Sequence, residues 1–362
     1  MALSLGTNSD SLTSDTMVAN ADLYVTEELI PNVFDSTTVL KMLGGKEMLD
    51  MGEDGIEAAG ESLELRNGGE VIAINLMTNK GDMTQALDEF EIISVEQPRV
   101  AEPSWVDWKE YATPATISRR QLRKNSGSQS HFDLQDAYLK QAEMDIIEKL
   151  DIDLVRGDQS ESTLASINSK RVHGISYYVE ENPESSSTVA NVARASNDWH
   201  HNRSNLTSDN SISDTPAFDT EGVKDILLLM LEARAGTGSD EVDCFLTNDS
   251  IFSYWWDELD DLVRFPSSGP ADNLTGDLYR EPTFKGRPVY TSKALTGISV
   301  ENVYGIAKKY FHLVVDRESF FVFDGEQEPY NQLASVSYII AMLNLICSNP
   351  RRSFVLTGIT AS

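Results

Sequence analysis

The longest regular pattern of apolar positions lies between residues 133 and 156. Apolar residues recur there at steps of three and four, which predicts one buried face of a long helix; they are Leu139, Ala142, Ile146, Leu150 and Leu154. Asp133 suits the N-cap and Gly157 follows the last turn, so we expect a helix over residues 133–156, roughly 35 Å long. The charged residues mostly avoid the stripe and should face solvent; they are Glu143, Asp145, Glu148, Lys149, Asp151 and Asp153.

Residues 57–110 have a different pattern, in which short alternating pieces are separated by turn signals. Extended runs are expected at 63–65, 71–76 and 90–95, with turns at 67–69 and 79–82. The segment is acidic and has too few large apolar residues to form a core. An isolated hairpin is marginally stable in water, so we expect this one to form an arm that lies against another surface.

Residues 1–56 begin with a small, polar stretch and continue with a helical apolar pattern over 21–51, broken at Pro31. This pattern predicts an extended, partly helical N-terminal arm. Its apolar residues need a surface to cover, such as one on another subunit.

The remainder alternates between helical and extended patterns, which predicts an α+β fold. Residues 158–220 are expected to be mainly surface loop. A helix after Asp219 or Thr220 should bury Val223, Ile226, Leu227, Met230 and Leu231. A strand at 242–246 precedes a third helix, capped by Asn248, Asp249 or Ser250. Residues 311–315 and 320–323 are expected to pair as a hairpin, and strands follow at 336–347 and 354–356.

The charge balance changes the functional picture. The chain has 29 Lys and Arg against 58 Asp and Glu, a formal charge of −29. Such an acidic surface argues against direct binding of nucleic acid, because phosphate binding needs clustered cations. It suits a protein that encloses a polyanion without binding it, or one that works at high salt, and the sequence leaves both open.

No residues form a recognisable catalytic or cofactor motif, so we expect no enzyme and no cofactor. Asp198, His200 and His201 are expected to be solvated loop residues rather than metal ligands. Four acids beside two tryptophans suggest a solvated helix face rather than a catalytic pair; they are Asp257, Glu258, Asp260 and Asp261. Cys244 and Cys347 are expected to be buried, reduced thiols. Neither a signal peptide nor a membrane-spanning run is recognisable.

One basic cluster contrasts with the acidic background: Arg119, Arg120, Arg123 and Lys124. One interpretation is a solvated connector with local ion pairs. The alternative is that these cations receive carboxylates from the acidic arm, or from the N-terminal segment, of a neighbouring subunit. Exposed pairs contribute only ~0–1 kcal/mol each, but repetition around a closed assembly would add them.

The order of the parts resembles a known family. The acidic β segment is followed by ISRRQL, a long helix ending LVRGD, EGVKDILLLMLEAR, TNDSIFSYWWDEL, FKGRPVY and SYIIAMLNLICSNPRRSFVLTG. This series is similar to the major capsid protein of tailed phages, the Hong Kong 97-type shell fold, over about residues 57–357. The order and spacing carry the resemblance more than any single motif.

The resemblance implies a domain organisation. Residues 1–56 would be the N-terminal arm and 57–110 the extended loop, a hairpin arm lying across a neighbouring subunit. Residues 111–239 would be the peripheral domain with its spine helix at 133–156, and 240–334 the axial domain. Residues 335–362 would return the chain to the peripheral domain as a closing strand.

It also implies a function: subunits that assemble into hexamers and pentamers, forming an icosahedral shell around phage DNA after assembly in the host cytoplasm. A portal, decoration proteins and a separate scaffolding protein are then expected partners, with no specific nucleic-acid binding and no membrane. Two alternatives remain. A related encapsulin-like nanocompartment would share the fold, and an acidic extracellular or halophilic hydrolase would belong to a different class.

Overall fold

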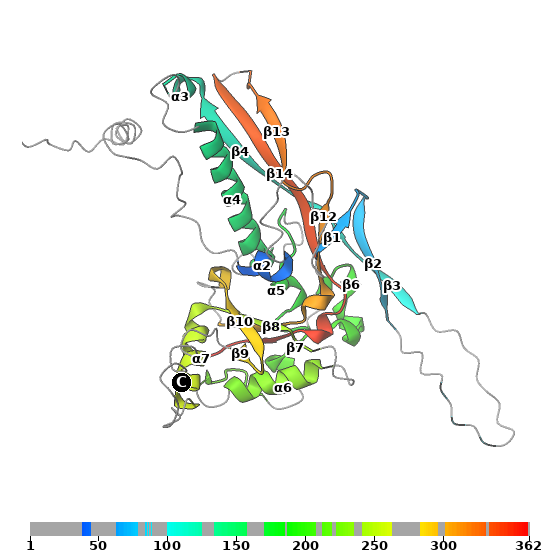
Figure 1. Cartoon of the computed structure of the whole chain (residues 1–362). Helices are drawn as coiled ribbons and strands as arrows, with labels where there is room; N and C mark the ends of the chain where they lie inside the picture. The colour runs from blue at the N-terminus through cyan, green and yellow to red at the C-terminus, as the bar shows by residue number, and fades with distance from the viewer. Residues whose placement is uncertain are drawn as a thin grey trace, which may run out of the picture.

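The computed structural model describes residues 38–44, 63–78, 84, 86, 88, 100–124, 134–157, 170–184, 187–207, 212–218, 222–234, 241–262, 283–295, 301–330 and 333–360. They form two mixed sheets with helices packed on them, and a hairpin arm that projects from the side of the body (Figure 1). The predicted mixture of helices and sheets is confirmed.

The first sheet is organised around one long strand, β14 (Ala334–Cys347). Its order is β1 (Leu63–Arg66), β12 (Phe311–Asp316), β14 and β13 (Val322–Gln327), while β4 (Lys109–Ser118) pairs with the other edge of β14. The β4 register runs over ten residue pairs, from Ser118 with Ala334 to Lys109 with Leu343. At 3.3 Å per residue, β14 is roughly 46 Å long, so it extends from the end of the sheet that pairs with β13 to the part that pairs with β12 (Figure 1).

The helix α4 (Leu134–Arg156) lies along this sheet, and its bounds confirm the prediction to within one residue. Ala142 packs between Ala115 of β4 and Ile339 of β14, and Leu150 and Leu154 are fully buried in the main core. The helix ends where Gly157 adopts a φ of 58°, a left-handed conformation that favours glycine. The apolar stripe read from the sequence is therefore the buried face.

Two acidic residues of α4 correct the prediction of a solvated face. Asp151 is 5% exposed, and its Oδ1 accepts hydrogen bonds from the backbone N–H groups of Val39 and Leu40, both at 2.8 Å. These groups begin the short helix α2 (Thr38–Gly44). Asp153 is fully buried and accepts a hydrogen bond from the Tyr111 hydroxyl at 2.9 Å. A carboxylate can be buried where such donors replace water, and periodicity cannot show the donors.

The predicted hairpin between residues 311–315 and 320–323 is also wrong in its pairing. Both strands exist, as β12 and β13, but each pairs antiparallel with β14 and they do not pair with each other. β12 meets Leu343–Cys347 of β14, and β13 meets the more N-terminal half of the same edge. The turn signal between the two segments favours a hairpin locally. The longer apolar strand β14, however, gives β12 and β13 more backbone pairing than they would give each other.

The second sheet has six short strands in the order β7 (Arg203–Ser204), β15 (Phe354–Leu356), β11 (Val303–Ile306), β8 (Cys244–Thr247), β10 (Arg287–Thr291) and β9 (Thr283–Phe284). The helices α6 (Val223–Ala233) and α7 (Asp249–Leu262) pack on it and bury an aromatic cluster that includes Phe245, Trp255 and Phe354. Asn248 caps α7, because its Oδ1 accepts from the Ile251 N–H at 2.9 Å. This confirms one of the predicted caps.

The buried face of α6 differs from the prediction at several positions, and Val223 and Leu227 are only half-buried. Ile226 and Met230 are buried as expected, but Leu231 is 50% exposed and Leu229 is fully buried instead. Residues 226–231 are six consecutive large apolar residues, so their sequence pattern does not determine which face of the helix is buried. The predicted cap residues Asp219 and Thr220 lie outside the described residues.

The sheets join segments that the predicted domain ranges separate. β12 and β13, which lie within 240–334, belong to the sheet built on β14 and β4. β15, which lies within 335–362, belongs to the other sheet beside β11. Leu63–Arg66, which lies within 57–110, likewise belongs to the first sheet, where β1 pairs parallel with β12. The chain therefore crosses between the two sheets several times.

The two cysteines are buried and free, as predicted. Burial raises the pKa of Cys244 and of Cys347 to about 12, so both thiols stay protonated at neutral pH. Neither has the exposed, electropositive surroundings of a reactive thiol.

Candidate subunit-contact site

The predicted basic cluster forms a short helix, α3 (Arg119–Lys124), at the distal end of β4 (Figure 1). Ser118 and Gln121 fix its start as a capping box: Ser118 Oγ accepts from the Arg120 N–H at 3.3 Å, and Gln121 Oε1 accepts from the Ser118 N–H at 3.1 Å. The segment expected to be a connector is thus a helical turn. We call its four cations the basic turn: Arg119, Arg120, Arg123 and Lys124.

All four side chains of the basic turn are exposed. Arg119, Arg120 and Lys124 form no ion pair with any residue in the described ranges. The local ion pairs considered from the sequence are therefore not seen for these three cations. Their charge faces outward, where an acidic partner can reach it.

An exposed apolar residue lies beside the basic turn. The Arg119 N–H donates to the Leu333 carbonyl at 3.1 Å, which holds α3 against the connection between β13 and β14. Leu333 is 80% exposed, Tyr330 on the same connection is fully exposed, and Phe323 on β13 is 49% exposed. This end of the sheet presents cations and large apolar groups together, a combination typical of protein-contact surfaces.

The arm is the antiparallel hairpin of β2 (Val71–Met77) and β3 (Ala101–Asp107), paired over all seven positions. Its base packs on its own chain, because Ile72 is fully buried and Val106 is 3% exposed. Met77 at the far end of β2 is 73% exposed. The predicted run 90–95 and the turn 79–82 lie outside the described residues.

A small hairpin of β5 (Thr188–Val189) and β6 (Val192–Ala193) supports the arm base. The Ala190 carbonyl in its turn accepts hydrogen bonds from Ser104 Oγ at 2.8 Å and from the Trp105 N–H at 3.2 Å. Ala190 and Asn191 have φ values of 47° and 64°, a tight turn that costs non-glycine residues conformational energy. The turn therefore holds a specific carbonyl against β3.

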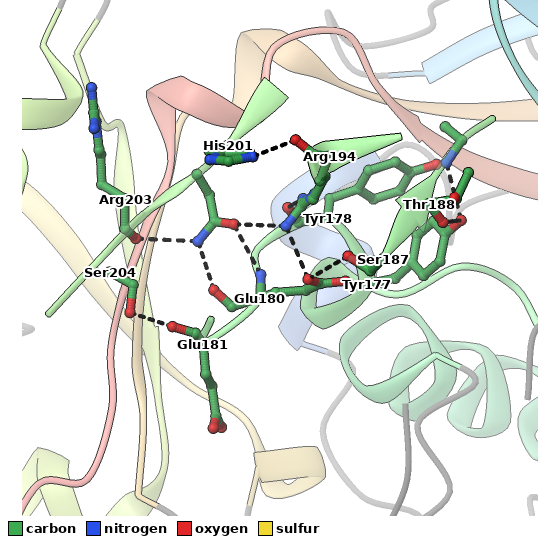
Figure 2. Close-up of polar contacts among 12 residues, drawn as sticks. Tyr177, Tyr178, Glu180, Glu181, Ser187, Thr188, Arg194, His201, Arg203 and Ser204 are labelled. Carbon is green, nitrogen blue, oxygen red and sulfur yellow. Dashed lines mark hydrogen bonds and ion pairs between the residues drawn. The ribbon is translucent and has the colours of Figure 1, made fainter. Parts of the chain in front are cut away.

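A buried charge network anchors this support (Figure 2). Arg194 is fully buried; it pairs with Glu180 at 3.2 Å, and donates to Asn202 Oδ1 at 3.2 Å and to the Tyr178 carbonyl at 2.6 Å. Ser187 Oγ also donates to Glu180, at 3.0 Å. Burial lowers the pKa of Arg194, and the Glu180 carboxylate partly offsets this.

The network corrects the prediction for residues 197–202. His200 is fully buried rather than solvated, and desolvation together with the Arg194 charge lowers its pKa to about 3. His201 is half-buried, and its Nε2 contacts the Arg194 carbonyl at 2.8 Å, while Asp198 is exposed as expected. The polar composition of this segment gave no indication of a buried cluster. The sequence feature that could have indicated it is the pair Glu180 and Arg194, which lie on either side of the buried Val189 and Val192.

Among the described residues, no group of three or more His, Cys, Asp or Glu side chains could hold a metal. The side chains of Asp257, Glu258, Asp260 and Asp261 lie outside the described set, although α7 includes their backbone. No helix in the described ranges is long and apolar enough to cross a membrane.

Comparison with known proteins identifies the fold. No protein-family profile and no curated sequence matches the chain. Solved structures do match over nearly its whole length. The cyanophage A-1(L) capsid subunit has a TM-score of 0.67 at 11% identity, covering 96% of this chain and all of that one. The capsid subunit of a native GTA particle has a TM-score of 0.61 at 12% identity, covering 98% and 100%.

An encapsulin shell protein, SrpI of Synechococcus elongatus, also matches, with a TM-score of 0.53 at 10% identity over 95% of this chain and 96% of that one. The chain thus has the fold of shell-forming proteins. Within that class, it has the tailed-phage major capsid fold that its sequence resembles, the Hong Kong 97-type fold.

Proposed function

We propose that this protein is the structural subunit of a phage capsid, assembling into hexamers and pentamers that form an icosahedral shell around genomic DNA. The observation that carries the proposal is the match to capsid subunits over 96–98% of the chain and their full length. An arm whose base packs on its own chain while Met77 at the far end of β2 is exposed, and a distal end with exposed cations and apolar groups, agree with a subunit completed by its neighbours.

In this proposal the elements take the roles that the family resemblance implies. The helix α4 is the spine helix of a peripheral domain, and the β2–β3 arm is the base of an extended loop that lies across a neighbour. The six-stranded sheet with α6 and α7 forms most of the axial domain. The basic turn receives carboxylates from a neighbour's acidic arm or N-terminal segment.

The acidity of the chain supports a wall that repels packaged DNA rather than binding it. With a formal charge of −29, the subunit contacts the genome without specific recognition. Assembly takes place in the host cytoplasm, with a separate scaffolding protein and a portal as partners, and with decoration proteins on the finished shell.

The second candidate function is an encapsulin-like compartment, favoured by the match to the encapsulin shell. The fold serves both functions, so contents and partners discriminate between them. A hydrolase has less support, because the solved structures described above, which match nearly the whole chain, are shell subunits.

The test is to express the chain alone and with candidate scaffolding protein, and to examine the purified product by negative-stain and cryo-electron microscopy. Closed shells or capsomer rings are expected. A monodisperse monomer under both conditions, with the arm folded on its own body, would contradict the proposal. Shells that form without scaffold and hold an enzyme rather than DNA would favour the compartment.

A further inference from the structure

A second basic cluster, which the sequence analysis did not single out, lies where β7 meets the C-terminal strand. Arg203 begins β7, and its N–H donates to the Ser353 carbonyl at 3.1 Å. Arg351 and Arg352 directly precede Ser353 in the short helical turn η8 (Pro350–Arg352). Three arginines thus converge through backbone pairing, although 148 positions separate Arg203 from Arg351 (351 − 203).

This cluster of Arg203, Arg351 and Arg352 forms no ion pair with the carboxylates of the described residues. The Nε–H groups of Arg203 and Arg352 are buried and donate to no acceptor in the described residues. Figure 2 shows the Arg203 side chain directed away from the Asn202–Glu180 contacts, with no bond drawn to its guanidinium.

The positive charges of the three arginines also repel one another, which affects the pKa of Arg351. The pKa of Arg351 is lowered first by burial and then by the charges of Arg203 and Arg352, while Asp198 acts in the opposite direction. Arg352 has one structural role, since it donates to the Ala233 carbonyl at the end of α6 at 3.2 Å. Arg203 and Arg351 have no side-chain bond of this kind within the described ranges.

We infer that Arg203 and Arg351, with Arg352 beside them, form a surface that receives carboxylates of a second copy of this chain. Half-buried arginines favour bidentate contacts with carboxylates, and a second copy presents twice as many acidic as basic residues. A polyphosphate would instead have to approach a subunit with a formal charge of −29. This surface is distinct from the basic turn of α3, and the inference rests on the proposed shell function.

A charge-retaining variant tests the inference directly. Arg351→Lys keeps the cation and adds an amine, which a zero-length carbodiimide reagent couples only to a carboxylate in contact with it. Equal amounts of ¹⁵N-labelled and unlabelled full-length protein are assembled together, cross-linked and analysed by mass spectrometry. We expect peptides that join residue 351 of one isotope to an Asp or Glu of the other. Cross-links found only within one chain, for example to Asp198, would overturn the inference.

A charge-removing variant measures the consequence. We expect Arg203→Gln combined with Arg351→Gln to raise the concentration of unassembled subunit roughly two- to five-fold per contact, and the corresponding double Lys variant to restore assembly. Arg317→Gln, at an exposed turn, is the matched control and should assemble normally. Assembly by the double Gln variant that equals wild type, or a loss only of retained nucleic acid, would overturn the inference.

The same samples separate this inference from the shell proposal. Absence of shells in the wild-type protein contradicts the shell function itself. Normal wild-type shells combined with no intermolecular cross-link at residue 351 contradict only the role of the arginines. Thermal unfolding of each variant checks that a loss of assembly does not reflect a loss of folding.

Discussion

Ser104 Oγ donates to the Ala190 carbonyl at 2.8 Å, and both residues are almost fully buried. This bond joins the arm to the β5–β6 turn, which the Arg194–Glu180 pair in turn anchors to the body. The direction in which the arm leaves the subunit therefore depends on a buried charge network that is distant in sequence.

Replacing Ser104 with Ala should loosen the arm base. The Ala190 carbonyl keeps the Trp105 N–H but loses one donor, so we expect a loss of about 0.5–1.5 kcal/mol in the free energy of unfolding. Amide hydrogen exchange in β2 and β3 should quicken. Ser253→Ala on the exposed face of α7 is the control, and unchanged exchange in β2 and β3 of the Ser104 variant would contradict the prediction.

Replacing Glu180 with Gln should be far more damaging. It leaves the Arg194 guanidinium fully buried without a counter-charge, which costs about 3–5 kcal/mol in the free energy of unfolding. Arg234→Gln removes an ion pair with Glu241 in which Arg234 is 46% exposed, and should cost at most ~1 kcal/mol. Urea denaturation of both variants measures the difference, and equal losses would refute the role assigned to burial.

The protein should lose stability as the pH falls below about 6.5. His200 has a folded pKa of about 3, below its ordinary value, so the unfolded chain binds the proton first and acid favours unfolding. By pH 5 the loss from this residue should be roughly 2 kcal/mol. Burial lowers the pKa of His312 as well, with the same sign.

His200→Gln isolates the contribution of His200, because glutamine stays neutral throughout. The variant should lose about 2 kcal/mol less than wild type between pH 7 and pH 5, measured by urea denaturation at each pH. An identical pH dependence in the two proteins would show that His200 does not carry the effect.

Gly174 should tolerate no side chain. A Cβ there would lie 2.5 Å from the Gly157 nitrogen and 2.7 Å from the Val155 carbonyl oxygen, both backbone atoms at the end of α4. We expect Gly174→Ala to cost at least ~1–3 kcal/mol, because the backbone has to move. Gly325→Ala, where nothing lies within 4 Å, is the control in thermal unfolding. Equal melting temperatures for the Gly174→Ala and Gly325→Ala variants would contradict the close approach of Gly174 to the backbone at the end of α4.

Reversing Arg119 and Arg120 to Glu should impair shell assembly while leaving the fold intact. Both side chains are exposed and form no ion pair with a described residue, so stability should change by less than about 0.5 kcal/mol. Particle yield by sedimentation is the measurement. The control is Lys224→Glu combined with Arg317→Glu, which makes the same charge change elsewhere on the surface. An equal particle yield from the two double variants would show that the basic turn has no special role in assembly.

The sequence by itself determined the elements with strong local signals. The α4 stripe, the Asn248 cap and the β15 strand follow from periodicity and from backbone preferences that act within a few residues. The ordered series of these elements was enough to indicate the capsid fold. The basic turn was also readable, because clustered cations contrast with an acidic chain.

Only the tertiary structure decided which distant segments meet. It placed β12 and β13 one after the other along the same edge of β14, buried Asp151 under the start of α2, and joined Arg203 to the turn before Phe354. It also turned a polar segment into a buried network around Arg194. The physical reason is that a buried charge needs partners that only folding brings to it. The partners of Asp151 lie more than a hundred residues away and those of Arg194 lie 8 to 16 residues away, and hydrophobic periodicity contains no information about either set.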